Sequence, residues 1–242
     1  MNRRVFLTTS IGLASAPLWS QSHPPKPYST DLLLGQKTLK LYKTSIPLAK
    51  KAGRAFEKMQ NAARKEGIEI EIVSGYRSYE RQKAIWNRKF KANKTAGYSD
   101  QENLKKIIEY STLPGTSRHH WGTEVDLIDG SQPKNGDVLL TEKFKEKGPY
   151  AVLKKWMDEH ANTFGFYLPY TENPQRKGFY YEPWHYSYAP LSIPLLKAYT
   201  ELDLNQVLKT EGLEGKHALT TDFLQYYYQN HIMGINPLLK NF

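Results

Sequence analysis

The chain has 242 residues, with hydrophobic and aromatic fractions of 39% and 13% that exclude a largely disordered protein. Its net charge is +10, but the basic residues are dispersed and show no zinc-finger or RNA-binding spacing, so we expect no nucleic-acid partner. The absence of cysteine excludes disulfides and thiolate metal sites, which leaves His, Asp and Glu as the strong zinc ligands.

The first 22 residues have the composition of an export signal. Arg3 and Arg4 precede an apolar stretch, residues 5–19, that is too short and too rich in Ser and Thr to span a membrane. This run resembles a bacterial twin-arginine signal, which exports folded proteins. An uncleaved membrane anchor stays open as an alternative, because Pro17 follows the best small-residue cleavage site. In either case we expect the following domain to face the periplasm or the outside.

The first structural elements follow a polar entry segment at residues 23–42. Ser45 and Pro47 predict the start of a helix, since Ser is a good N-cap and Pro fits the first turn. Apolar residues at helical spacing extend this helix to Gly67. Residues 68–73 alternate apolar and charged side chains, which predicts a strand with one buried face.

A second helix follows directly after this strand. Ser78 can cap it, and Gln82, Trp86 and Phe90 fall four residues apart on one of its faces. Arg77 therefore lies at a strand-to-helix junction, where a side chain is held firmly and can reach a cleft.

The middle of the chain predicts a third helix and a second strand. Asp100 can cap a short helix that runs to about residue 110. Residues 123–128 predict a strand that places Glu124, Asp126 and Ile128 on the same face.

The remaining pattern predicts a helix at 150–164, on which Val152, Trp156 and His160 are spaced by four, and a short strand at about 179–188. Helices and strands mix without a βαβ rhythm, which predicts an α+β fold: a small antiparallel sheet flanked by helices in a single domain. We expect this domain at residues 23–189, followed by a C-terminal extension, 190–242, of unknown role.

Three residues have the chemistry of a catalytic zinc site. His119, Asp126 and His185 supply two nitrogen donors and one oxygen donor, and three protein ligands leave a fourth position for water. Gly122 allows the tight turn that lets His119 and Asp126 converge. His120 competes with His119, because a shift of one residue changes the face and only one of the two can point at the metal.

Glu182 precedes His185 by three residues and has the chemistry of a general base. Pro183 excludes a helix interior, and the odd spacing excludes a regular strand that presents both side chains on one face. We therefore expect the chain to turn into a strand at Trp184, with Glu182 off the metal but within ~3 Å of its bound water.

Together these segments resemble the zinc D-Ala-D-Ala carboxypeptidase family, the VanY-type and LD-carboxypeptidase-like enzymes that trim peptidoglycan stem peptides. The family pattern is Ser-Gly-Tyr-Arg-Ser with a following Gln, then Ser-x-His-x-x-Gly-x-Ala-x-Asp, then Glu-x-Trp-His. This chain carries it at 74–82, 117–126 and 182–185, and the resemblance covers about 52–188. It implies a hedgehog/DD-peptidase-like fold and selects His119 over His120.

One position departs from the family pattern. Glu124 stands where the family commonly has a small residue. We expect Glu124 to pair with Arg77 or Arg118 in support of the metal ligands, or to form an ordinary salt bridge away from the site.

The resemblance implies a role for each matched residue. One zinc ion is bound by His119, Asp126 and His185, with Glu182 as the catalytic base and Arg77 stabilising the oxyanion. The expected substrate-binding residues are Gln82, Ser117, Ser78 and Trp184. The expected function is removal of a terminal D-alanine from peptidoglycan stem peptides, by DD- or LD-cleavage, in an exported or periplasmic monomer. The alternatives are an endopeptidase or D-Ala-D-Ala dipeptidase of the same fold, or a non-catalytic cell-wall-binding protein.

Overall fold

The computed structural model describes residues 27–208 and 211–242, so the expected export signal lies outside the described residues. A four-stranded antiparallel sheet with the order β3-β4-β6-β5 organises the chain. Its strands are β3 (Ile70–Ser74), β4 (Glu124–Asp129), β6 (His185–Tyr188) and β5 (Phe166–Tyr167). The mixture of helices with small antiparallel sheets confirms the α+β prediction.

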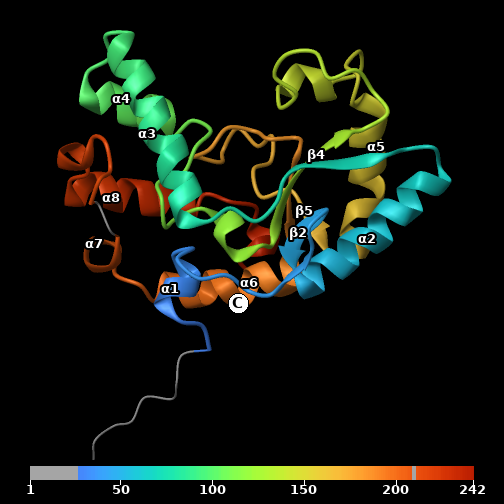
Figure 1. Ribbon diagram of the computed structural model, residues 1–242, viewed down its shortest axis with the longest axis horizontal. Coiled ribbons are helices and arrows are strands. Elements are labelled where there is room, and N and C mark those ends of the chain that lie inside the picture. Colours follow the sequence, from blue (N-terminus) through green and yellow to red (C-terminus); the bar gives the residue numbers. More distant parts are fainter. Residues whose placement is uncertain (1–26, 209–210) are drawn as a thin grey trace, which may run out of the picture.

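The central strand β4 is buried along its whole length and has two chemically different faces. Val125 and Leu127 pack with Tyr186 of β6 against apolar residues of α2 (Lys50–Lys65) and α5 (Ala151–His160). Glu124 and Asp126 alternate with these residues, so they lie on the opposite face, as the sequence predicts. Figure 1 shows α2 and α5 on one side of β4, with α3 (Tyr79–Thr95) and α4 (Asp100–Ile107) on the other.

The second helix has the buried face that its spacing predicts. Ser78 accepts a hydrogen bond from the backbone N–H of Arg81 and caps α3, while Gln82, Trp86 and Phe90 are buried. In the larger core Trp86 and Phe90 pack with α1 (Thr30–Leu33), α6 (Ala189–Thr200), α7 (Leu204–Val207) and α8 (Thr221–Tyr227).

The C-terminal segment therefore shares a core with the residues that precede it. The Tyr199 hydroxyl donates to the Gly115 carbonyl, and the Tyr227 hydroxyl accepts from the backbone N–H of Leu113. Both tyrosines are buried, and both hold the loop that leads to His119.

Several predicted element boundaries are wrong. Ile46–Ala49 is strand β2, paired with β1 (Leu41–Lys43), and the helix expected from Ser45 begins only at Lys50. The reason is burial with period two, since Ile46 and Leu48 both enter the core, and the Pro47 carbonyl accepts the Tyr76 N–H.

The later elements show two similar differences. Trp156 is buried as expected, but Val152 is 65% exposed, because Leu153 and Met157 complete the buried face of α5. The strand expected from residue 179 begins only at His185, because the preceding residues turn. Within the described residues, no helix combines the length and apolar character needed to cross a membrane.

Candidate active site

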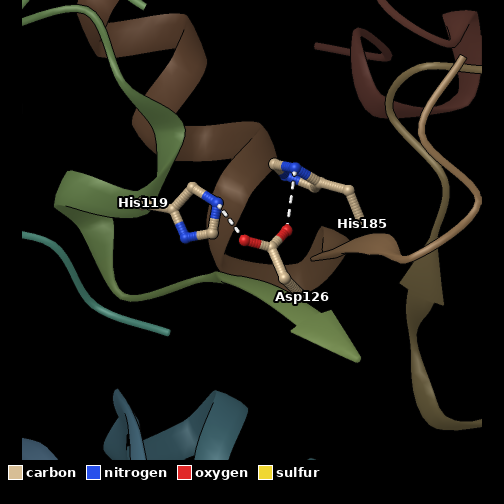
Figure 2. A group of neighbouring side chains, drawn as sticks. All are labelled: His119, Asp126 and His185. Atoms are coloured by element: carbon tan, nitrogen blue, oxygen red, sulfur yellow. Dashed lines mark ion pairs between the residues drawn. The ribbon is translucent and has the colours of Figure 1, made fainter. Parts of the chain in front are cut away.

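Three segments bring His119, Asp126 and His185 together. His119 lies on a 3-10 turn (Arg118–Trp121), and Asp126 on β4 stands directly opposite His185, the first residue of β6. One ligand atom from each residue lies within 4.8 Å of the other two, and all three side chains are buried. Figure 2 shows the Asp126 carboxylate between the two imidazole rings.

Gly122 makes this convergence possible. It ends the 3-10 turn with a φ of +66°, a conformation that side chains strain, and its N–H bonds to the His119 carbonyl. A Cβ at this position would lie 3.0 Å from the backbone nitrogen of Ala49. The tight turn lets the chain pass from His119 into β4 within a few residues.

Each imidazole presents one nitrogen to Asp126 and has the other nitrogen occupied. His119 Nε2 lies 3.4 Å from Asp126 Oδ2, while its Nδ1 is 2.7 Å from the Gly75 carbonyl oxygen. His185 Nδ1 lies 3.3 Å from Asp126 Oδ1, while its Nε2 is 3.0 Å from Glu124 Oε2. Oδ1 of Asp126 has no hydrogen-bond partner among the described residues. This set of inward-facing donors fits a zinc ion.

The protonation equilibria of His119 and Asp126 favour a metal cation at this point, whereas His185 holds a proton that a metal ion would displace. Burial lowers the pKa of His119, which keeps its ring in the neutral form that binds metals. Burial opposes ionisation of Asp126, but His119, His185 and Arg77 outweigh it and lower the pKa of Asp126 to about 2. Burial likewise lowers the pKa of His185, yet hydrogen bonds to Glu124 and Glu182 raise it to about 10.

His120 has a different role from His119. Its Nδ1 lies 2.6 Å from the Arg77 carbonyl oxygen, and its Nε2 accepts the Gly115 N–H. These bonds join the loop before the 3-10 turn to the strand-to-helix junction. Because both ring nitrogens are engaged away from Asp126, the geometry favours His119 as the ligand.

Glu182 borders the group without belonging to its ligand set. Its Oε2 lies 3.0 Å from His185 Nδ1, and its carbonyl accepts the His185 N–H, so the chain turns there as expected. Burial raises the pKa of Glu182 even though His185 and Arg77 oppose it. A buried carboxyl with a raised pKa beside a metal site is suited to proton transfer.

Arg77 points into the same region from the end of β3. Its guanidinium donates to Ser74 Oγ and to Gln82 Oε1, both at 2.9 Å, and lies 3.8 Å from Asp126 Oδ2. The side chain is 21% exposed, so it can be reached from solvent. Two fixed hydrogen bonds therefore orient a partly accessible cation beside the candidate ligands.

A cleft of about 620 Å³ opens onto this constellation. His119, Asp126, Glu182, His185 and Arg77 all line it. Of the four predicted substrate-binding residues, its wall includes Ser117 and Trp184 but neither Ser78 nor Gln82.

The three polar members of that predicted set differ in their partners. Ser117 Oγ is buried with no hydrogen-bond partner among the described residues, which leaves it available to a ligand. Ser78 caps α3, while Gln82 is fully buried behind Arg77 and donates to the Thr112 carbonyl. Ser117 therefore presents its hydroxyl at the cleft wall, whereas Gln82 holds the Arg77 guanidinium from behind.

The cleft also contains residues that the sequence patterns did not indicate. Arg88 and Lys89 of α3 line one wall, and burial lowers the pKa of Lys89. Tyr170 is buried, with its ring centroid 5.1 Å from that of His185. The two basic residues follow Ile85 at helical spacing, a signal that could have found them, whereas the loop containing Tyr170 has no periodic pattern.

Glu124 pairs with Arg118 rather than Arg77. Its Oε1 lies 3.2 Å from the Arg118 guanidinium, and both side chains are buried. Burial disfavours the charge of Glu124, but Arg118 and His185 outweigh it and lower its pKa to about 2. The strand thus carries a second ionised carboxylate beside the candidate ligands.

Comparisons with known proteins agree with this geometry. The D-alanyl-D-alanine carboxypeptidase family VanY matches residues 45–191. A D-alanyl-D-alanine carboxypeptidase of Enterococcus faecalis is 29% identical over 153 residues, which are 62% of this chain and 52% of that protein. The chain spans about half the length of the first curated relatives that it matches.

Two solved structures have a similar fold. The structure of VanYB with D-alanine-D-alanine has a TM-score of 0.51 at 25% identity, covering 73% of this chain and 91% of that one. A variant of the vancomycin-resistance D,D-pentapeptidase VanY, in complex with Zn(II), has a TM-score of 0.51 at 24% identity, covering 71% and 90% of the two chains.

Proposed function

The chain belongs to the VanY family of D-alanyl-D-alanine carboxypeptidases, and we propose that it is a zinc peptidase that removes a terminal D-alanine from peptidoglycan stem peptides. The observation that carries the proposal is the buried group of His119, Asp126 and His185, with Glu182 beside it, at the wall of a cleft. All four residues of the expected metal and base set are present, which favours a catalyst over a binding protein.

His119 Nε2, the Asp126 carboxylate and His185 Nδ1 would hold the metal. A zinc ion bound there supplies an acidified water molecule and polarises the scissile carbonyl. The remaining steps use the protein's own groups. The Glu182 carboxylate accepts a proton from the attacking water and returns it to the leaving amine nitrogen, and its contact with His185 Nδ1 places it beside the site where that water would bind.

Arg77 is placed to stabilise negative charge on the substrate. A guanidinium with two of its donors fixed by Ser74 and Gln82 presents its charge without reorganising during the reaction. Ser117 Oγ offers an unused hydrogen-bonding group on the same wall. Arg88 and Lys89 add positive charge further along the cleft, which suits the carboxylates of a stem peptide.

The substrate lies outside the cytoplasm, so the function requires export. The Arg3-Arg4 signal meets that requirement, and a folded exported enzyme could acquire zinc before it leaves the cytoplasm. We propose that the mature protein acts in the periplasm or at the cell exterior as a monomer.

The test combines defined substrates with two substitutions. Purified protein with zinc is incubated with penta- and tetrapeptide muropeptides, and the products are identified by mass spectrometry. Loss of one alanine from the pentapeptide indicates DD-cleavage, and loss from the tetrapeptide indicates LD-cleavage. Release of a dipeptide, or cleavage of a cross-link, would assign the alternative peptidase activities.

The substitutions separate metal binding from proton transfer. His185→Ala should lose the metal, whereas Glu182→Ala should keep it and lose about 10²- to 10⁴-fold in kcat. His217→Ala is the matched control, because this histidine side chain is 70% exposed and pairs with Asp100 instead. Equal metal loss in both site variants, or full activity after exhaustive chelation, would overturn the proposal.

A further inference from the structure

Glu124 has a fully buried carboxylate for which the proposed reaction has no direct use. It lies two residues before Asp126 on the same face of β4 and is 0% exposed. Burial of a carboxylate is costly unless its oxygens are paired and hydrogen-bonded. The partners of its two oxygens therefore show what this side chain does.

The two oxygens of Glu124 have different partners. Oε1 accepts from the Arg118 guanidinium at 3.2 Å, from Thr123 Oγ1 at 2.9 Å and from Ser187 Oγ at 2.7 Å. Among the described residues, Oε2 has one hydrogen-bond partner, His185 Nε2, at 3.0 Å. An ordinary ion pair with Arg118 needs only the first oxygen, so the second is directed at the imidazole.

The two candidate histidine ligands are held in the same manner. His119 directs Nε2 towards Asp126, and its Nδ1 faces the Gly75 carbonyl. His185 directs Nδ1 towards Asp126, and its Nε2 faces the Glu124 carboxylate. A metal-binding histidine commonly donates its second N–H to a carboxylate or carbonyl, which fixes its tautomer and ring orientation. One ring has a neutral carbonyl in this position and the other has a carboxylate.

We propose that Glu124 is a positioning residue that accepts the Nε2–H of His185 and so presents Nδ1 of that ring to the metal. This inference rests on the proposed zinc site. Arg118, Thr123 and Ser187 hold the carboxylate by its other oxygen, so that it cannot rotate away from the ring. Arg118 also compensates the buried negative charge, because its own guanidinium is buried beside it.

This arrangement has two effects on the affinity of the site for the metal. The carboxylate raises the basicity of the ring, and the fixed orientation removes the entropy cost of aligning it, so both effects tighten binding. The ring of His119 lacks the first effect because its partner is an uncharged carbonyl. The contribution of Glu124 should therefore appear in metal affinity as well as in turnover.

The test measures metal binding directly. We compare the unsubstituted protein with Glu124→Gln, which keeps the volume of the side chain and removes its charge. The zinc dissociation constant is measured by competition with a chromophoric chelator, and the visible spectrum of the cobalt-substituted protein reports ligand geometry. Glu124→Gln should weaken zinc binding at least tenfold, within the 10- to 100-fold range typical of such partners, and should alter the cobalt spectrum.

Ser187→Ala is the matched control, because it removes a hydrogen bond to Oε1 and leaves the contact with His185 in place. It should change zinc affinity by less than about threefold. If Glu124→Gln does not fold, the double variant Glu124→Ala/Arg118→Met removes both buried charges together and is measured in the same way.

Three outcomes would contradict the proposals. Unchanged zinc affinity and an unchanged cobalt spectrum in Glu124→Gln, even with lower thermal stability, would leave Glu124 as a structural ion pair with Arg118. Equal weakening in Ser187→Ala would assign the effect to the whole network rather than to the His185 contact. Failure of the unsubstituted protein to bind zinc would instead overturn the proposed function itself.

Discussion

The contact between Arg77 and Gln82 gives a test of how the cleft is organised. Gln82 was expected to touch substrate, but it lies behind Arg77 and accepts one of its hydrogen bonds at 2.9 Å. We expect Gln82 to act through Arg77. If so, Gln82→Met should lower activity only while Arg77 is present.

The size of each effect follows from the contacts. Removing a charged donor that stabilises an oxyanion costs about 10²- to 10³-fold, so Arg77→Ala should lower kcat/KM by that amount. Gln82→Met removes one of two hydrogen bonds that orient the guanidinium, and Ser74 keeps the other at 2.9 Å. A hydrogen bond to a charged group contributes about 1.5–3 kcal/mol, so partial loss of orientation should lower kcat/KM roughly tenfold.

The assay is a double-mutant cycle on kcat/KM with a pentapeptide muropeptide, with melting temperatures measured for all four proteins. The double variant should be no worse than Arg77→Ala alone, which gives a coupling energy of about 1.4 kcal/mol. If the two losses multiply instead, Gln82 contacts the substrate independently and the interpretation of its position is wrong.

Two further predictions concern stability and export. Tyr227→Phe should lower the melting temperature by about 5 °C, because it leaves the buried Leu113 N–H unpaired at a cost of about 1–3 kcal/mol. The control is Tyr226→Phe at the exposed neighbouring position, which should change the melting temperature by no more than about 1 °C. Equal melting temperatures for the two variants would refute the reasoning. Replacing Arg3 and Arg4 by Lys should retain the precursor in the cytoplasm while lysates stay active, and export at the normal rate would assign the signal to the general secretion route.

The local features of the fold could be predicted because they depend on residues close in sequence. Spacing by four identified the buried face formed by Gln82, Trp86 and Phe90, and alternation placed Glu124 on the same face as Asp126. The predicted start of α2 was wrong. Ser45 and Pro47 satisfy the rules for a helix start, but the pairing of Ile46–Ala49 with β1 makes this segment a strand.

The position of the C-terminal segment could not be predicted, because its contacts join residues about half the chain apart. The bond from Tyr227 to Leu113 joins residues 114 positions apart, and the bond from Trp86 to the Glu214 carbonyl joins residues 128 positions apart. Such contacts leave no periodic signal in the sequence. They nevertheless bear on the site, since the loop that Tyr227 and Tyr199 hold leads directly to His119.

The strand that carries the candidate site contains residues that are costly to bury in a core. Every residue of β4 is buried, yet Glu124, Asp126 and Asp129 are carboxylates, each of which must be compensated. Asp129 Oδ1 accepts hydrogen bonds from the backbone N–H and the hydroxyl of Ser131 in a turn. The Glu124 carboxylate has four hydrogen-bond partners in the protein. Asp126 keeps a fully buried oxygen, Oδ1, without a hydrogen bond among the described residues, and that oxygen faces His185. A buried carboxylate whose protein partners are incomplete indicates a position selected for a ligand rather than for stability, and it lies where the proposed metal would bind.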